Sequence, residues 1–241
     1  RFMNIIRNDK LIKRNKTIGQ ICTYGSLIIL IIGLVFAFGG DISRILWSYA
    51  ALIVGFVLSQ IGMYFTNRFG RSPRFDEIFA TAFEKLRSDY TFYVYSSPVP
   101  LLLIGPCHIW VPIPVTASGK ISYIDGKWKQ EGGNFMMKVF GQEGLGKPDR
   151  EALADEEAIR SYLASKGIPE ESQPPINHVL VVLLKNTKIG DVSQAPIPVV
   201  ELPEIKRYIR RVDRESCETP LSDEQIEQLN AALSEFGKKT R

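Results

Sequence analysis

The sequence contains two uncharged apolar runs of 21 residues each, IGQICTYGSLIILIIGLVFAF (residues 18–38) and ILWSYAALIVGFVLSQIGMYF (residues 45–65). A helix rises about 1.5 Å per residue, so each run is long enough to cross the ~30 Å hydrocarbon core of a bilayer. Only residues 39–44 separate the two runs. The pair predicts a transmembrane helical hairpin over residues 18–66, and the longer C-terminal remainder of the chain suffices for one folded domain.

Basic residues gather on the outer flanks of both runs. Residues 1–17 contain six Lys and Arg against one Asp, and residues 68–74 contain three Arg and no acid, whereas residues 75–241 carry a net charge of −4. Lys and Arg accumulate on the cytoplasmic side of membrane proteins, so we expect a two-pass protein with both termini and the folded domain in the cytoplasm. The first run is too long for a cleaved signal peptide. Contacts with anionic lipid headgroups are expected from the flanking cations Arg7, Lys10, Lys13, Arg14, Lys16, Arg68 and Arg71.

Small residues recur along both apolar runs. Small residues let helices approach closely in a membrane, and the contact they make is either within the hairpin or with a second protein. Neither run contains Asp, Glu, Lys, Arg or His, which argues against an ion or proton pathway through this chain alone. The candidate packing residues are Gly25, Gly33, Gly55, Ser59 and Gly62.

The composition also limits the classes of partner. A sequence-independent nucleic-acid binder needs a cationic face, whereas the region after the hairpin is mildly acidic. We therefore expect the bilayer and other membrane protein subunits as partners, with no cofactor and no evident small-molecule substrate. Cys22, Cys107 and Cys217 are odd in number and lack metal-ligand spacing, which predicts free thiols in a reducing compartment.

The region after the hairpin alternates helical and strand patterns. Apolar spacing predicts an amphipathic helix over residues 75–86, and a Ser222–Gln225 capping box predicts the start of the last helix. Asp125-Gly126 predicts a tight hairpin turn, and Pro112 and Pro114 predict that the third strand stops at a sheet edge or bulge. The other expected elements are strands at 90–95, 99–104, 107–113, 121–124, 127–129, 176–184 and 197–200, and helices at 149–166 and 203–213. This order predicts an α/β domain with a mixed sheet flanked by helices.

A glycine-rich segment, residues 131–148, interrupts this series. It has neither the GxxxxGK[ST] pattern of a phosphate-binding loop nor a strand and helix in the required register. We expect a flexible or substrate-covering loop there and not a nucleotide site.

Several short motifs resemble those of the nuclease-related domain (NERD) family. They are Leu101-Leu-Leu-Ile-Gly-Pro106, Gly119-Lys-Ile121 and Gly126-Lys-Trp128, with Gly146-Lys147-Pro148 similar to the pair that opens the family's next helix. The similarity covers roughly residues 72–190. The order of one helix, three strands, a helix and a strand also resembles the restriction-endonuclease-like core. The resemblance implies a Mg²⁺-dependent phosphodiesterase site built from an Asp and an acid-x-Lys motif.

The chain departs from this family at the residues that carry its chemistry. Alignment on Gly105-Pro106 places Pro100 at the Asp position, Ile113 at the second acid and Val115 at the Lys. Residues 91–120 contain no carboxylate, and apolar side chains cannot bind Mg²⁺. We therefore expect no catalytic residues and no metal; only Asp125 or Glu143 remain as relocated ligands.

Three other features have a structural and a functional interpretation. His108 follows Cys107, but adjacent strand residues point to opposite faces, so both His108 and His178 are expected to be satisfied structural histidines. The cations Lys206, Arg207, Arg210 and Arg211 share one helix. They predict either a solvated helix face or a docking site for lipid headgroups, an acidic partner or a nucleic-acid strand.

Together these patterns divide the chain into four parts: a basic juxtamembrane segment (1–17), the transmembrane hairpin (18–66), a NERD-like α/β domain (72–215) and a C-terminal helix (216–241). The function they favour is a non-catalytic, membrane-anchored interaction module or accessory subunit of a membrane protein assembly. The alternative is a membrane-tethered, Mg²⁺-dependent nuclease or nucleic-acid processing enzyme with relocated ligands. A scaffold held at the lipid surface by the basic N-terminus is a third possibility.

Overall fold

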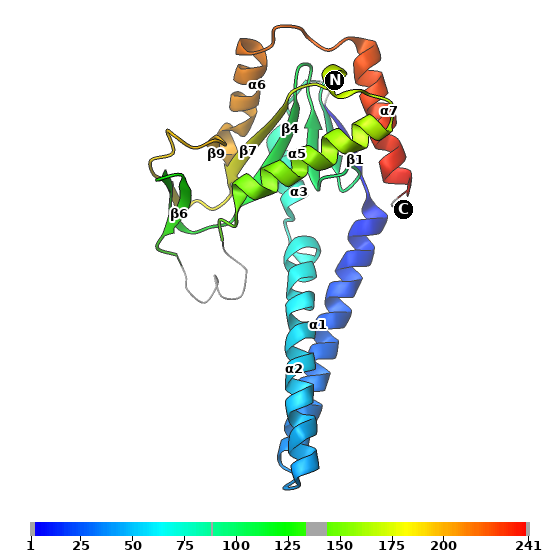
Figure 1. The fold of residues 1–241 in the computed structure, drawn as a ribbon, viewed down its shortest axis with the longest axis vertical. Coiled ribbons are helices and arrows are strands. Elements are labelled where there is room, and N and C mark those ends of the chain that lie inside the picture. Colours follow the sequence, from blue (N-terminus) through cyan, green and yellow to red (C-terminus); the bar gives the residue numbers. More distant parts are fainter. Residues whose placement is uncertain (1–2, 88, 134–143, 240–241) are drawn as a thin grey trace. The chain divides into compact units, whose positions relative to one another are not determined.

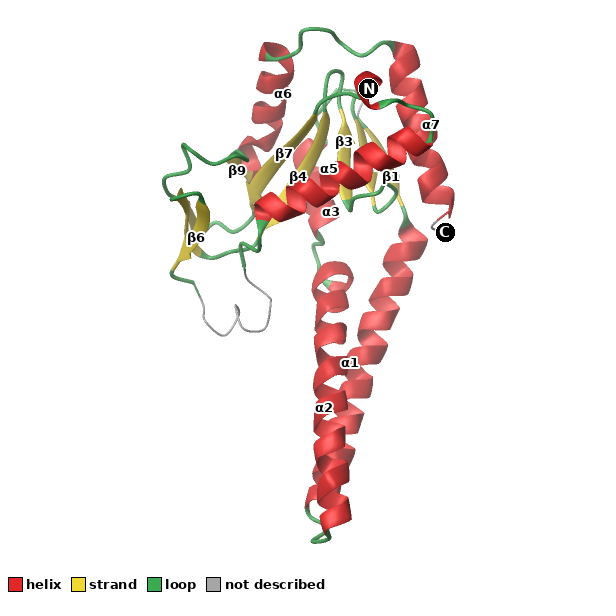
Figure 2. Cartoon of the chain, in the orientation of Figure 1, coloured by secondary structure: helices red, strands yellow, loops and turns green. Residues whose placement is uncertain are grey.

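The computed structural model describes residues 3–87, 89–133 and 144–239. The chain forms two compact units (Figures 1 and 2). One unit is the helical hairpin, Asp9–Arg74, and the other combines Arg1–Asn8 with Phe75–Arg241. We call the second one the folded unit.

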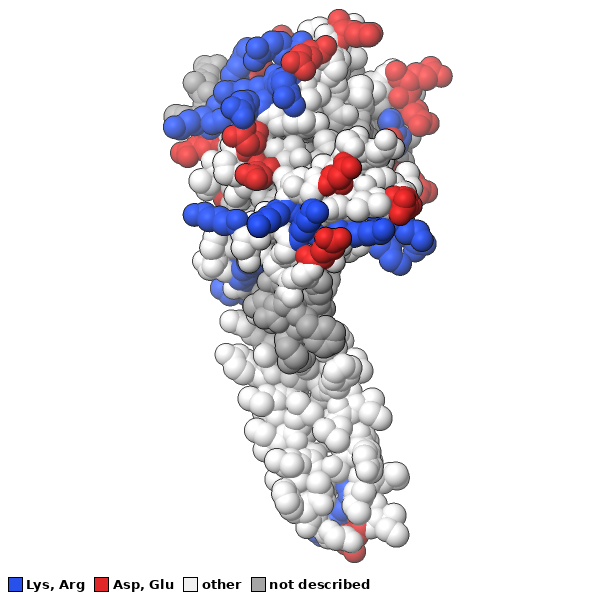
Figure 3. Space-filling view, turned by 90° about the vertical axis from the view of Figure 1, so that its left-hand side faces the viewer, with Lys and Arg blue, Asp and Glu red and all other residues white. Residues whose placement is uncertain are grey.

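The hairpin consists of α1 (Asp9–Ala37) and α2 (Ile42–Phe65), followed by a π-helical turn (Thr66–Gly70). Both helices are long and apolar enough to span a bilayer. Most of their large apolar side chains are exposed, which is the pattern of helices that face lipid rather than a protein core. The space-filling view shows little charge along the two apolar runs; in the turn between them, Arg44 lies 3.7 Å from Asp41 (Figure 3).

The contact between α1 and α2 is made by small residues at seven-residue spacing. The buried positions of α1 include Gly19, Ser26 and Gly33, and those of α2 are Ser48, Gly55 and Gly62. A Cβ atom at Gly33 would lie 2.7 Å from Ala51 Cβ, and one at Gly62 would lie 2.8 Å from the backbone nitrogen of Thr23. The repeat therefore lets the two helices touch along their backbones, as membrane helices often do.

The predicted packing residues divide between this contact and the outer surface. Gly33, Gly55 and Gly62 lie in the contact, and Ser59 is half-buried. Gly25 has no atom within 4 Å of the place its Cβ would occupy, so it lies away from α2.

The folded unit contains two sheets. The six-stranded sheet has the order β1-β2-β3-β4-β7-β9, in which β3 is antiparallel to both neighbours and all other pairs are parallel. A three-stranded sheet has the order β6-β5-β8, with β5 antiparallel to β6 and parallel to β8. The strands are β1 (Asn4–Arg7), β2 (Thr91–Val94), β3 (Leu101–Ile104), β4 (Ile109–Val115), β5 (Gly119–Ile124), β6 (Lys127–Glu131), β7 (Ile176–Val182), β8 (Thr187–Ile189) and β9 (Val199–Glu201).

Helices cover both faces of the six-stranded sheet (Figure 1). On one face, α5 (Pro148–Ser165) and α7 (Asp223–Lys239) bury Ile159 and Leu229 against strand residues such as Val111. On the other face lie α3 (Phe75–Phe83) and α6 (Ile205–Glu215); the ring of Phe83 is 5.3 Å from that of Phe92. Short 3₁₀ turns occupy Glu170–Ser172 and Leu202–Glu204. The predicted α/β class, a mixed sheet flanked by helices, is confirmed.

The first residues of the chain belong to the sheet, although the sequence predicts a segment lying on the membrane surface. Asn4 N donates to Tyr90 O (3.2 Å) and Asn8 N donates to Val94 O (3.0 Å), which adds β1 beside β2. Arg7 lies 3.3 Å from the carboxylate of Asp76, which is wholly buried at the start of α3. The side chain of Arg7 is therefore committed to an ion pair inside the folded unit.

Two local predictions are confirmed and one is wrong. Asp125 (φ 55°) and Gly126 (φ 71°) form the predicted tight turn, and Ser222 and Gln225 exchange the two capping-box hydrogen bonds. The third strand, however, continues through Pro112 to Val115. In β4 the odd-numbered residues hydrogen-bond to β7, so the proline nitrogens point to the side where pairing with β3 has already ended.

Candidate functional site

A cavity of about 480 Å³ lies in the folded unit where β7 begins, between α5, α6 and the segment that leads into β9. Its apolar lining comes mainly from Trp110, Ala152, Ile176, Ile197 and Val212. Its polar lining is formed by Asp149, Glu156, Asn177, His178 and Tyr208. A small apolar floor with a few convergent polar groups is typical of a binding site.

The position of the cavity follows from the short pairing of β7 with β9. β4 pairs with all seven residues of β7, but β9 pairs only with Leu180, Val181 and Val182. The next hydrogen bond toward the start of β7 would need an N–H from residue 198, and Pro198 has none. The first part of β7 therefore has an open edge, and the cavity lies along it.

Two carboxylates on α5 line one wall. Trp128 Nε1 donates to Asp149 Oδ1 (2.7 Å), and Arg160 Nε donates to Glu156 Oε1 (2.8 Å). Asp149 and Glu156 are seven residues apart, or about two helical turns, so both point to the same side of α5. The sequence predicts that Asp149 begins its helix, but the helix starts at Pro148. The Asp149 carboxylate lines the cavity.

His178 lies beside these carboxylates. Burial lowers the pKa of its imidazole, and the smaller, opposing effect of Glu156 raises it. Its Nε2 atom is buried and has no hydrogen-bond partner among the described residues. The prediction of a fully satisfied structural histidine is therefore wrong for this nitrogen.

The opposite wall is formed by aromatic residues of β4 and α6. The rings of Trp110 and Tyr208 meet edge to face with centroids 6.1 Å apart, and burial raises the pKa of the Tyr208 hydroxyl. The guanidinium of Arg211 lies 5.4 Å from the centroid of the Tyr208 ring. Trp110 Nε1 donates a hydrogen bond to Asp213 Oδ1 (3.2 Å), which fixes the position of the indole ring in this wall.

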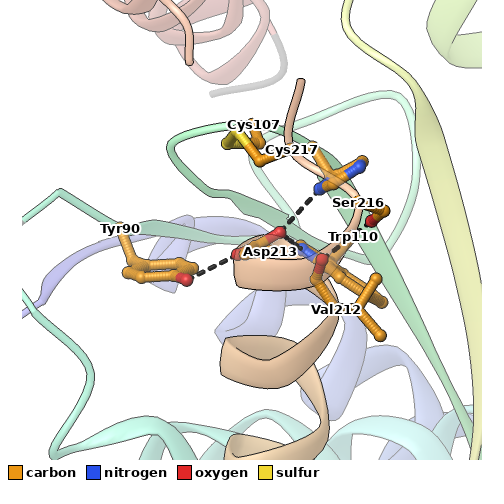
Figure 4. Close-up of a disulfide and its surroundings, with 8 residues drawn as sticks. Tyr90, Cys107, Trp110, Val212, Asp213, Ser216 and Cys217 are labelled. Atoms are coloured by element: carbon orange, nitrogen blue, oxygen red, sulfur yellow. Dashed lines mark hydrogen bonds and ion pairs between the residues drawn. A yellow bond between two sulfur atoms is a disulfide. The ribbon is translucent and has the colours of Figure 1, made fainter. Parts of the chain in front are cut away.

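Asp213 is the centre of a buried polar cluster (Figure 4). Tyr90 Oη donates to its Oδ2 (2.5 Å), and His108 Nδ1 lies 2.6 Å from its Oδ1. Burial is the main cause of a raised Tyr90 pKa, and the hydrogen bond to Asp213 adds to it. Gly105 makes the cluster possible, because a Cβ there would lie 2.8 Å from the Tyr90 ring and 3.2 Å from Asp213 Oδ2. The carboxylate of Asp213 thus positions His108, and no pattern in the sequence predicts that the two residues are neighbours.

A disulfide between Cys107 and Cys217 lies beside this cluster (Figure 4). The prediction that all three cysteines are free thiols is therefore wrong for these two, whereas Cys22 is free. The two cysteines are 110 residues apart in sequence, so their pairing depends on α6 ending next to the turn between β3 and β4. Leu221 N, which donates to Pro106 O (2.8 Å), fastens the same two segments.

The positions aligned with the family's metal ligands lie elsewhere. Ile113 and Val115 are buried in a core cluster with Ala152 and Leu180, and Pro100 is half-buried between β2 and β3. These apolar residues do not fit Mg²⁺, which requires oxygen ligands. Of the relocated candidates, Asp125 is in the β5–β6 turn, 3.5 Å from Lys129, and Glu143 is outside the described residues. Within the described ranges, no three His, Cys, Asp or Glu side chains gather as metal ligands.

The predicted cationic residues are at the surface. Lys10, Lys13, Arg14 and Lys16 lie in the first turns of α1 and are exposed, as is Arg71, whereas Arg68 donates to Tyr64 Oη (3.1 Å). On α6, Arg207 pairs with Glu204 and Arg210 donates to Lys85 O. Basic side chains gather over α6 on the face shown in Figure 3.

Comparison with protein-family models, with curated proteins and with solved structures finds no match to this chain.

Proposed function

We propose that this chain is a membrane-anchored interaction module, an accessory subunit of a membrane protein assembly. In this proposal the hairpin holds the chain in the bilayer, and the folded unit binds a partner protein instead of cleaving nucleic acid. The folded unit is a NERD-like, restriction-endonuclease-like domain that has lost the family's metal site. The six-stranded sheet and its helices support this relationship, since α3, β2, β3, β4, α5 and β7 follow one another as the expected helix, three strands, helix and strand, with the β5–β6 hairpin inserted before α5.

One observation carries the proposal. Ile113 and Val115, at the positions of the family's acid and lysine, are 5% and 2% exposed and pack against Leu180. Burial of each such side chain stabilises the fold by roughly 1.5–3 kcal/mol, whereas a buried carboxylate and lysine there would need partners. The residues that would carry catalysis in the family therefore contribute to the core here.

The orientation we propose is two-pass, with both ends of the hairpin and the folded unit on the cytoplasmic side. The clustered Lys and Arg on both flanks support it. The Cys107–Cys217 disulfide favours the opposite orientation, because disulfides persist mainly in oxidising compartments. Alkylation tests both the side of the membrane and the redox state of these two cysteines. A thiol that reacts only after the cells are opened lies on the cytoplasmic side, and the number of thiols that react shows whether Cys107 and Cys217 are paired.

Native gel electrophoresis with crosslinking tests the proposal. Membranes that contain the full chain are crosslinked and solubilised in mild detergent, and the purified chain is run beside them. A discrete species larger than the purified protein is expected in the membranes only. A species of the same size in both samples would mean self-association alone, and monomer in both would overturn the proposal.

A further inference from the structure

We infer that the cavity at the start of β7 accepts an extended peptide segment of a partner protein, which adds to the open strand edge and places a Lys or Arg side chain beside Asp149 and Glu156. This inference deepens the proposed function and rests on it, since it names the binding surface and the chemistry of the partner.

The open edge supplies the backbone contacts. Leu180 N donates to Pro198 O (2.9 Å), so the even-numbered residues of β7 direct their N–H and C=O groups toward β9. His178 is the next such residue, and among the described residues no backbone hydrogen bond joins it to β9 or to the segment before β9. Pro198 cannot donate to the His178 carbonyl, so the chain's own β9 cannot extend over this edge. Unpaired strand edges are templates for an added strand.

The space beside the edge has the size and shape that such a segment needs. Its 480 Å³ falls within the range of about 300–1,000 Å³ that is typical of ligand sites. Side chains of an added strand point alternately to the two sides of the sheet. One side would meet the aromatic wall of Trp110 and Tyr208, and the other would meet α5, where Leu153 is 69% exposed at the cavity.

The charge of the cavity selects the partner. Asp149 and Glu156 each have one carboxylate oxygen engaged by Trp128 or Arg160, and the second oxygen has no partner among the described residues. Arg160 and Arg211 are near these walls but do not line the cavity. The lowered pKa keeps His178 neutral at physiological pH, so the charged groups in the lining are acidic. A cationic side chain fits this lining, whereas an acidic one would be repelled.

Binding of short blocked peptides to the full chain in nanodiscs tests the inference. The probes are a valine–lysine–valine–threonine peptide, its glutamate counterpart, and the lysine peptide with its central amides N-methylated. Titration is followed by NMR of the His178 and Asn177 amides. The lysine peptide should bind at least about tenfold tighter than the other two, since one lost ion pair or strand hydrogen bond is worth about 1.4 kcal/mol. Equal binding of all three peptides would overturn the inference, as would shifts confined to other residues.

Charge-neutral variants test the acidic wall. The double variant Asp149→Asn, Glu156→Gln should bind the lysine and glutamate peptides equally, whereas Glu157→Gln, on an exposed position of the same helix, should keep the tenfold preference. Retained preference in the double variant would refute the assigned role of these carboxylates. If the native-gel complex persists while no peptide binds at β7, this inference fails and the proposed function stands.

Discussion

Replacement of Asp213 by Asn should destabilise the folded unit strongly, although the two side chains have nearly the same shape. Asp213 is 7% exposed and accepts hydrogen bonds from Tyr90 and Trp110, with His108 Nδ1 2.6 Å from its Oδ1. An Asn side chain offers one acceptor oxygen in place of two and turns an NH₂ group toward at least one of these donors. Both the charge and the match between donors and acceptors are lost.

The expected loss is about 2–4 kcal/mol of unfolding free energy, because each buried donor left without an acceptor costs about 1–3 kcal/mol. This is a large part of the ~5–15 kcal/mol that stabilises a typical domain. The cluster joins α6 to β2 and to the turn before β4, so the loss should be felt where these three elements meet. The effect should also reach the cavity, because Trp110 lines it.

Urea denaturation of the full chain in nanodiscs, followed by tryptophan fluorescence, measures this loss. Both proteins carry Trp47→Phe, which removes the indole in the hairpin, so the signal reports on Trp110 and Trp128. Glu215→Gln, an exposed change on the same helix, is the control and should shift stability by less than about 0.5 kcal/mol. If the unfolding free energy of the Asp213→Asn protein stays within about 1 kcal/mol of its parent, Asp213 is not the centre of a stabilising cluster, because about 1 kcal/mol is the net contribution of a single ordinary hydrogen bond.

Three further predictions concern the disulfide, the hairpin and His178. Cys217→Ser should lower the unfolding free energy by about 2–5 kcal/mol, because the disulfide closes a long loop, and the reduced parent protein should match it in the same urea titration. Gly62→Leu should force α1 and α2 apart by about 2–3 Å in spin-label distances, whereas Gly25→Leu should leave them unchanged. Burial lowers the pKa of His178 in the folded chain below its ordinary value of 6.5. As the pH falls below 6.5, the unfolded chain therefore takes up a proton at His178 before the folded chain does, and the unfolding free energy decreases. His178→Gln should show a smaller loss between about pH 7.5 and 5.5 in urea titrations, and an identical loss would refute this assignment.

Local signals in the sequence predict much of the fold because their physical causes are local. Three such signals are the periodic spacing of apolar residues, an Asp-Gly turn and a capping box. Each depends on residues within a few positions of one another. Pro112 and Pro114 mislead the prediction because the rule for proline depends on which side of a strand still has a partner. That side is decided by the length of β3 and by the arrival of β7 more than sixty residues later.

Most of the candidate site could not be predicted from the sequence, because its residues are far apart along the chain. Asp213 and His108 are 105 residues apart, and no local pattern connects them. The free edge at His178 arises because β9 starts late, and the sequence signal of this is Pro198, one position before an apolar pair. The disulfide escapes prediction because three cysteines permit several pairings, and only the fold brings residues 107 and 217 together.

The central claim is that the folded unit does not cleave nucleic acid. The most direct measurement is incubation of the full chain with Mg²⁺ or Mn²⁺ and end-labelled DNA and RNA. We expect no metal-dependent cleavage above that of buffer, and the same result for Asp125→Ala. Metal-dependent cleavage that is abolished by Asp125→Ala or Glu143→Ala would overturn the proposed function and establish a nuclease with relocated ligands.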